Sequence, residues 1–232
     1  MRIDIIKNLE KLRILPRKKY HPLQHKIHKE HKISKRTLFY IKEYGPHSHV
    51  SKTIIKESIK ILLLASIISS VGGVSLEYIK NNFIALIPLI VLLPILNDMI
   101  GDYGIVVSSK FSSMLHEGLL NKKKLFNQKL TNLFFEILSI ALLTALFAAI
   151  LSLIVSLFSN YTFNLLIALK VLLVALLDSM ILVAILFFIS IYFGLYYYQK
   201  EEDPNNFLIP ITTSIADFGN MLLLSMLIII IF

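Results

Sequence analysis

The last apolar segment of the chain carries three polar residues whose spacing places them on one side of a helix. Thr213, Asp217 and Asn220 stand at positions i, i+4 and i+7, and the residues around them are almost all apolar. A carboxylate in such a segment costs about 2.5–3.5 kcal/mol on membrane-insertion scales, so we expect it to face a partner or water rather than lipid. The pattern predicts a cation site centred on Asp217. The alternative is an acid that is protonated or caps a neighbouring helix.

A second acidic pair lies in an apolar segment that its prolines and glycines are expected to interrupt. Asp98 and Asp102 are four residues apart and share a helix face, with Asn97 beside them. Gly101 and Gly104 permit close approach of the backbone to another backbone or to an ion. The prolines free carbonyl oxygens, which is tolerated where the backbone lines protein or a cavity. The segment predicts a second part of an ion path; the alternative is a kinked packing helix with its acids at the membrane edge.

Two further acids each have two possible roles. Asp203 follows Glu201 and Glu202 at the start of the last apolar segment. An acidic entrance concentrates cations, whereas an acid at a helix N-terminus is stabilised by the helix dipole, and both interpretations stay open. Asp178 lies deep in the fourth apolar segment, where we expect it either to support the ion site from behind or to pack within the bundle.

The candidate ligands are all hard oxygen donors: carboxylate, amide, hydroxyl and carbonyl. Such donors suit Mg²⁺, Ca²⁺ or Mn²⁺ rather than Zn²⁺ or Cu²⁺. Mg²⁺ dehydrates reluctantly and is often held through its waters by one or two carboxylates, so a few acids along a path suffice. The chain has no cysteine, which excludes disulfides and thiolate metal sites. We therefore expect Mg²⁺ as the ion, and no organic cofactor.

The elements that must position these residues are membrane-spanning helices. Hydrophobic residues make up 56% of the 232, and the mean hydropathy is +0.70, which places the chain among membrane proteins. The fold class predicted is all-α, with five spans of about 20 residues or more. Ala65, Ser69 and Gly73 are expected to form a small-residue packing stripe in the first span, and Pro210 is placed in the first turn of the fifth. The five spans are expected at about 56–78, 83–108, 131–158, 164–198 and 207–232.

The positive charge is concentrated ahead of the first span. Residues 1–50 contain thirteen Lys and Arg against four Asp and Glu, which accounts for the whole net charge of +9. We divide the chain into a basic arm, residues 1–52, and a membrane domain, residues 53–232. The first apolar run starts near Ile61, too late for a cleavable signal peptide. The arm is expected to bind anionic lipid headgroups. Metal binding by its histidines is a weaker alternative, and nucleic acid is not expected; the histidines are His21, His25, His28 and His31.

The lysines of the connections predict the orientation of the spans. The connection 109–130 carries five lysines, whereas the connections 79–82 and 159–163 together carry only Lys80. By the positive-inside rule the N-terminus is cytoplasmic, and after five crossings the C-terminus is outside. We expect a multi-pass protein of the cell membrane.

Two motifs among these residues resemble the membrane domain of MgtE-type magnesium channels and the related eukaryotic solute carrier family of magnesium transporters. One runs from Pro94 to Gly118 and includes Gly101, Gly104 and the adjacent Ser108 and Ser109. The other is more specific, keeps the family's spacing, and comprises Asp203, Pro204, Asn205, Asn206, Pro210, Thr212, Thr213 and Asp217. The resemblance covers about residues 55–232.

The resemblance implies a homodimer whose pore lies on the two-fold axis, lined by the second and fifth spans of each subunit. It also implies that Asp217 is the ion-coordinating acid of the pore and that Asp203 is an acid of the cytoplasmic mouth. Two departures are visible. The basic arm stands where bacterial members have a large cytosolic regulatory region, and the second span reads Asn97, Asp98 and Asp102 where the family more often has Gly and Asn, which bears on ion preference.

We interpret the chain as a divalent-cation transporter or channel, with Mg²⁺ the expected ion and no covalent chemistry. A proton- or sodium-coupled antiporter, in which Asp98, Asp102 or Asp178 titrates, is the alternative within transport. A non-transporting scaffold that presents the basic arm is the alternative outside it. An enzyme is not expected, because no Ser/His pair or HExxH motif occurs within the spans.

Overall fold

A computed structural model describes residues 7–9, 11–12, 22–33, 38, 50–117, 119–120, 128–159, 161–162, 164–200 and 203–232. The described part is all-helical and contains no strand. Five helices are long and apolar enough to cross a membrane, so the protein is a multi-pass membrane protein. These helices are α4 (Val50–Tyr78), α6 (Ile87–His116), α7 (Gln128–Leu157), α8 (Leu165–Gln199) and α9 (Pro204–Ile231).

Local signals in the sequence start two of these helices. The side chain of Asn164 accepts a hydrogen bond from the backbone N–H of Leu166 at 3.0 Å and caps α8. Asp203 caps α9 in the same way, and Pro204 follows it in the first turn, where a missing N–H costs nothing. A short helix that the sequence did not predict, α5 (Lys80–Ala85), joins α4 to α6.

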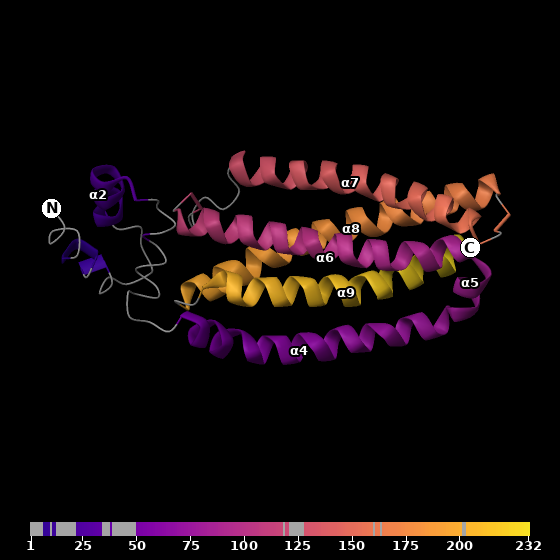
Figure 1. Ribbon diagram of the computed structural model, residues 1–232, viewed down its shortest axis with the longest axis horizontal. Helices are drawn as coiled ribbons and strands as arrows, with labels where there is room; N and C mark the ends of the chain where they lie inside the picture. The colour runs from indigo at the N-terminus through magenta and orange to yellow at the C-terminus, as the bar shows by residue number, and fades with distance from the viewer. Residues whose placement is uncertain are drawn as a thin grey trace.

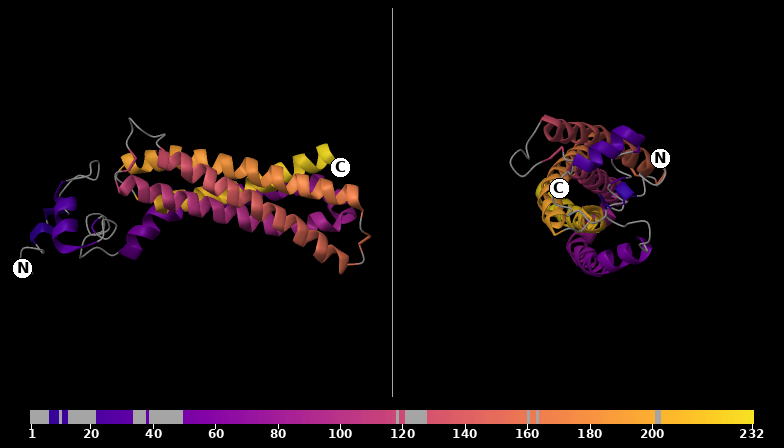
Figure 2. Two further views of the ribbon diagram at one scale, coloured as in Figure 1. Left: turned by 90° about the horizontal axis from the view of Figure 1, so that it is seen from above. Right: turned by 90° about the vertical axis from the view of Figure 1, so that its left-hand side faces the viewer.

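Helix α9 occupies the centre of the bundle and packs against α4, α6 and α8. Helix α7 covers α6 and α8, while α4 lies along the outside of α9 and buries the smallest share of its span (Figure 1). The views in Figure 2 show the five long helices running nearly side by side along one axis. The N-terminal arm and the C-terminus lie at opposite ends of the bundle, as an odd number of crossings requires.

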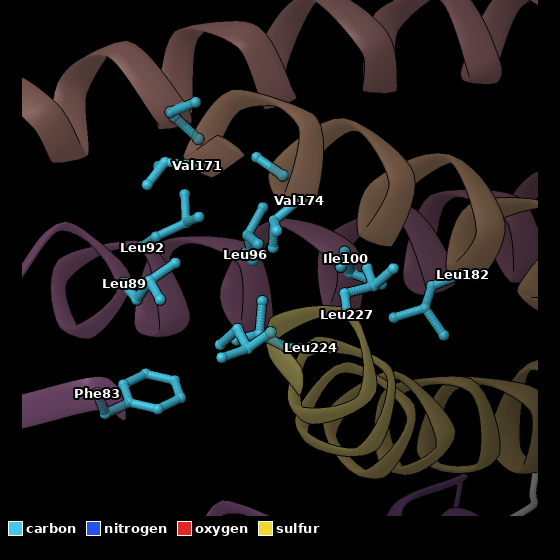
Figure 3. Close-up of a cluster of buried hydrophobic side chains, with 14 of the residues drawn as sticks. Phe83, Leu89, Leu92, Leu96, Ile100, Val171, Val174, Leu182, Leu224 and Leu227 are labelled. Carbon is cyan, nitrogen blue, oxygen red and sulfur yellow. The ribbon is translucent and has the colours of Figure 1, made fainter. Parts of the chain in front are cut away.

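Two apolar clusters hold α6, α7, α8 and α9 together. One lies toward the end of the bundle that carries the C-terminus; there Leu92, Leu96 and Ile100 of α6 meet Val171 and Val174 of α8 and Leu224 of α9 (Figure 3). The other lies toward the N-terminal arm and contains Phe111 of α6, Ile137 of α7, Phe187 of α8 and Leu208 of α9. Because both clusters draw on several helices, polar residues between them are held at fixed positions.

The structure corrects three expectations about prolines and small residues. Helix α6 is continuous, with Pro94 inside it, rather than interrupted. Pro210 lies inside α9, beyond the first turn, because that helix already begins at Pro204. In the small-residue stripe, Gly73 is exposed and a Cβ there would meet nothing within 4 Å, whereas a Cβ at Gly72 would lie 3.1 Å from the backbone of Phe218. The close packing of α4 on α9 therefore uses the neighbouring glycine.

The described part of the N-terminal arm includes α2 (Pro22–His31) and a small apolar cluster formed by Leu12, Ile27 and Leu38. His28 Nδ1 lies 2.6 Å from the backbone oxygen of Ile33. His21 lies outside the described residues. The boundary between arm and membrane domain at residue 52 stays a prediction; helix α4 begins at Val50.

Candidate cation site

Asp217 is half-buried in the bundle and is held by side chains from two other helices. Asn97 Nδ2 of α6 donates to Asp217 Oδ1 at 2.8 Å, and Ser69 Oγ of α4 donates to Asp217 Oδ2 at 3.3 Å. Both oxygens of the carboxylate are thus oriented. The lone pairs that remain can accept hydrogen bonds from water or coordinate a cation. The site is built where α4, α6 and α9 meet.

Two more polar residues, Asn220 and Asp178, lie deeper in the bundle next to this site. Asn220 is one turn from Asp217 on α9 and is fully buried. In one orientation its amide nitrogen donates to Asn97 Oδ1 at 3.0 Å; in the other it donates to Asp178 Oδ2 of α8 at 2.8 Å. Asp178, Asn220, Asn97 and Asp217 therefore form a continuous line across α8, α9 and α6, which we call the amide relay.

Asp98 and Asp102 open onto a groove of about 820 Å³ between α6 and α7. Both carboxylates are exposed, one turn apart on α6. On the opposite wall, Thr144 of α7 is hydrogen-bonded to Tyr103 at 2.7 Å between the two hydroxyl oxygens. Asn97 also lines this groove, so a single side chain contacts both the groove and Asp217.

Three buried hydroxyls join α6, α8 and α9 in the next layer of the bundle. Ser108 Oγ lies 3.3 Å from Ser190 Oγ and 3.2 Å from Thr212 Oγ1. A Cβ at Gly104 would lie 3.1 Å from the Cβ of Thr212, so this glycine does allow α6 to approach α9 closely. A Cβ at Gly101 would meet nothing within 4 Å, so no other helix of the described part approaches closely there; approach of an ion to Gly101 stays a prediction.

A family model for the MgtE divalent cation transporters matches residues 93–227, which is more than half of the chain. This chain belongs to the MgtE family of divalent cation transporters. The match covers α7 and α8 completely, most of α6 and α9, and all four members of the amide relay. Comparison with curated proteins finds no match, and comparison with solved structures finds none either.

Asp203 of this MgtE-family protein is a buried helix cap rather than an open carboxylate at an entrance. Its side chain accepts from the backbone N–H of Asn205 at 3.0 Å, and His116 Nε2 lies 3.7 Å from the same carboxylate oxygen. Only 4% of Asp203 is exposed. These contacts show that Asp203 lies at the N-terminus of α9 and caps that helix. A role for Asp203 at the mouth of an ion path stays a prediction.

Sequence reasoning did not single out three residues that the MgtE-family fold places at these sites. Ser69 was noted only for its small size, yet it contacts Asp217. Thr144 reaches the groove, and His116 reaches Asp203. No local pattern could have found them, because each belongs to a helix other than the one it serves. The hydroxyl of Thr213 donates to the backbone oxygen of Ile209 in its own helix at 2.9 Å, and its place along an ion path stays a prediction.

The membrane acids of this MgtE-family chain have no basic partner in the described residues. None of the ion pairs found there involves Asp98, Asp102, Asp178 or Asp217. Within the same residues no three His, Cys, Asp or Glu side chains gather closely enough to hold a metal ion by themselves. The geometry offers single carboxylates assisted by amides and hydroxyls, an arrangement suited to a cation that keeps part of its water shell.

Proposed function

We propose that this MgtE-family transporter moves Mg²⁺ across the cell membrane by way of Asp217. The observation that carries the proposal is an acid set in an apolar bundle, with both oxygens oriented by Asn97 and Ser69 and no basic side chain beside it among the described residues. An acid in a membrane span is costly unless it has a polar role. A passing cation supplies the missing positive charge.

Hard oxygen donors support Mg²⁺ as the ion. Asp217 supplies the charge, and the ion keeps waters that hydrogen-bond to neighbouring oxygens, since Mg²⁺ is usually held by one or two carboxylates plus water. Asn97 and Ser69 keep the carboxylate in one orientation, which reduces the ordering that a binding ion must impose. The exposed carboxylates of Asp98 and Asp102 attract the hydrated ion to the neighbouring groove.

A second copy of the chain completes the path in this proposal. The exposed stripe of α6 repeats every four residues and carries two carboxylates in its middle, where lipid is an unfavourable neighbour. Two-fold pairing of such stripes brings together the same acids from both copies. The stripe consists of Ile90, Pro94, Asp98, Asp102, Val106 and Lys110.

The membrane potential is sufficient to drive uptake with the N-terminal arm on the cytoplasmic side. Moving one charge through 100 mV is worth about 2.3 kcal/mol, so a divalent ion gains about 4.6 kcal/mol. No covalent step is required. The arm, with its excess of Lys and Arg, binds the anionic inner leaflet.

Reconstitution tests the proposal. Purified protein in liposomes should take up Mg²⁺, measured with an internal Mg²⁺-sensitive dye, and an inside-negative potassium-diffusion potential should increase the rate. Mn²⁺ serves as the competing ion. Uptake that requires an imposed pH or Na⁺ gradient would indicate an antiporter, and absence of uptake for both ions would refute the proposal.

A further inference from the structure

Asp178 is the most deeply buried acid among the membrane helices that the structure describes. Its exposure is 0%, and its Oδ1 has no hydrogen-bond partner among the described residues. Its Oδ2 lies 2.8 Å from the amide of Asn220. Apolar residues of the cluster that includes Val174, Ala175 and Leu182 surround it on α8. Asp178 does not line the groove, and its contact with Asn220 is what connects it to Asn97 and Asp217.

The direction of the amide relay follows from counting donors and acceptors. Each Asn side chain has one end that donates and one that accepts. When Asn97 donates to Asp217, its oxygen faces Asn220, which must donate in turn. The oxygen of Asn220 then faces Asp178 Oδ2 and needs a donor, which a protonated carboxyl supplies. In this direction the carboxylate of Asp217 accepts and is ready for a cation.

The opposite direction disables the site. If Asp178 accepts from Asn220 instead, the oxygen of Asn220 accepts from the backbone N–H of Asn97 at 3.3 Å but also lies 3.0 Å from Asn97 Oδ1. These two oxygens repel unless the side-chain amide of Asn97 also turns over. The oxygen of Asn97 then takes the place of Nδ2, which now lies 2.8 Å from Asp217 Oδ1, and faces that carboxylate oxygen. In that orientation Asn97 no longer donates to Asp217, and its oxygen repels the carboxylate instead of orienting it. The two amides therefore turn together.

We propose that Asp178 is a positioning residue that sets the direction of the amide relay and thereby the affinity of Asp217 for the transported cation. This inference rests on the proposed function, because it concerns the same ion site. Its basis is the unbroken series of contacts from α8 through α9 and α6. Asp178 and Asn220, at the inner end of the series, are fully buried. The apparent affinity for a ligand is the intrinsic affinity multiplied by the fraction of molecules in the binding-competent state. A change in the direction of the relay therefore changes the apparent affinity for the cation.

Two substitutions of Asp178 distinguish its effect on the direction of the amide relay from its effect on packing in the bundle. Asp178→Asn keeps the shape, and its amide nitrogen can donate to Asn220, so the relay stays directed toward Asp217. Asp178→Leu keeps the volume but leaves the oxygen of Asn220 without a donor. Ser179→Ala is the matched control, because Ser179 is equally buried on the same helix and its hydroxyl has no hydrogen-bond partner in the described part of the chain.

The measurement is Mg²⁺ uptake into liposomes as a function of external Mg²⁺, which gives a half-saturating concentration and a maximal rate. Asp178→Leu should raise the half-saturating concentration about tenfold, the scale of one buried hydrogen bond left unmade, with a nearly unchanged maximal rate. Asp178→Asn and Ser179→Ala should keep or lower that concentration. Asn220→Leu should match Asp178→Leu, and the double variant should show no further loss, because both break the same line of contacts.

Three results would overturn the inference: wild-type affinity in Asp178→Leu, an equal loss in Asp178→Asn, or additive losses in the double variant. Should Asp178→Leu not yield folded protein by size-exclusion chromatography, Asn220→Leu and Asp178→Asn decide the matter by opposite effects on the half-saturating concentration. The wild-type protein separates the two proposals. If it moves neither Mg²⁺ nor Mn²⁺, the proposed function fails; if it moves Mg²⁺ and the variants are unaltered, only the role of Asp178 fails.

Discussion

The carboxylate of Asp217 is the residue on which the proposed transport depends most directly. Asp217→Asn keeps the size of the side chain and an oxygen that accepts from Asn97, so we expect the fold to remain. The variant lacks the charge that attracts a divalent cation, and Mg²⁺ uptake should fall by about 100-fold, equivalent to about 2.8 kcal/mol. Uptake in liposomes, normalised to the amount of folded protein, is the measurement.

Glu136→Gln is the control for this residue. Glu136 is an exposed acid on α7, remote in sequence from the relay, and removal of its charge should leave uptake unchanged. If Asp217→Asn transports as fast as the control, the ion site has been placed on the wrong acid.

At the scale of the elements, glycines decide how closely the helices approach one another. A Cβ at Gly194 of α8 would lie 2.6 Å from the ring of Phe111 of α6, a buried side chain. Gly194→Ala should therefore force the two helices apart or rotate the ring, at a cost of about 1–3 kcal/mol in the free energy of unfolding. Thermal unfolding in detergent should show a lower midpoint.

Gly101→Ala provides the same chemical change in the middle of α6 without a steric conflict, because a Cβ there meets no atom within 4 Å. We expect an unaltered or slightly higher midpoint, since alanine favours a helix over glycine. Equal midpoints for the two variants would show that α6 and α8 are less closely packed than the structure describes.

At the scale of the whole molecule, pairing of two copies through α6 and α9 is the first prediction. The chain has no cysteine, so single cysteines can be introduced without background. Val106→Cys on α6 and Met226→Cys on α9 replace exposed residues of the two helices expected at the interface. Oxidation in membranes should give crosslinked dimers for at least one of them. Leu143→Cys, exposed on α7, should give none. Mg²⁺ transport by liposomes that each contain a single copy of the chain would contradict the pairing.

The basic arm gives the second prediction at this scale. We expect its lysines and arginines to pair with acids at the adjoining end of the bundle or with anionic lipid, and Mg²⁺ to compete for the same acids. A surface ion pair contributes only about 0–1 kcal/mol, so several must act together. Deletion of residues 1–45 should change how uptake depends on internal Mg²⁺ or on ionic strength. If both titrations match those of the full chain, the arm serves only topology and anchoring.

The sequence by itself determined the fold class and the identity of the candidate ligands. Each span is a local signal, because about 20 consecutive apolar residues are needed to cross the membrane and are visible without knowledge of any neighbour. The same holds for Asp217, whose cost in an apolar segment marks it wherever the helix packs. Continuous helices through Pro94 and Pro210 were harder to predict, because surrounding helices compensate for a broken hydrogen bond.

Only the tertiary structure decided which polar groups meet. Asn97 contacts Asp217 across 120 positions of sequence, and Ser69 does so across 148; no spacing rule relates residues on different helices. The rotation of α4 about its own axis puts Gly72 rather than Gly73 against α9. The burial of Asp203, and the line of contacts from Asp178 to Asp217, follow in the same way. Partners are selected by the packing of whole helix faces, which depends on every side chain of those faces at once.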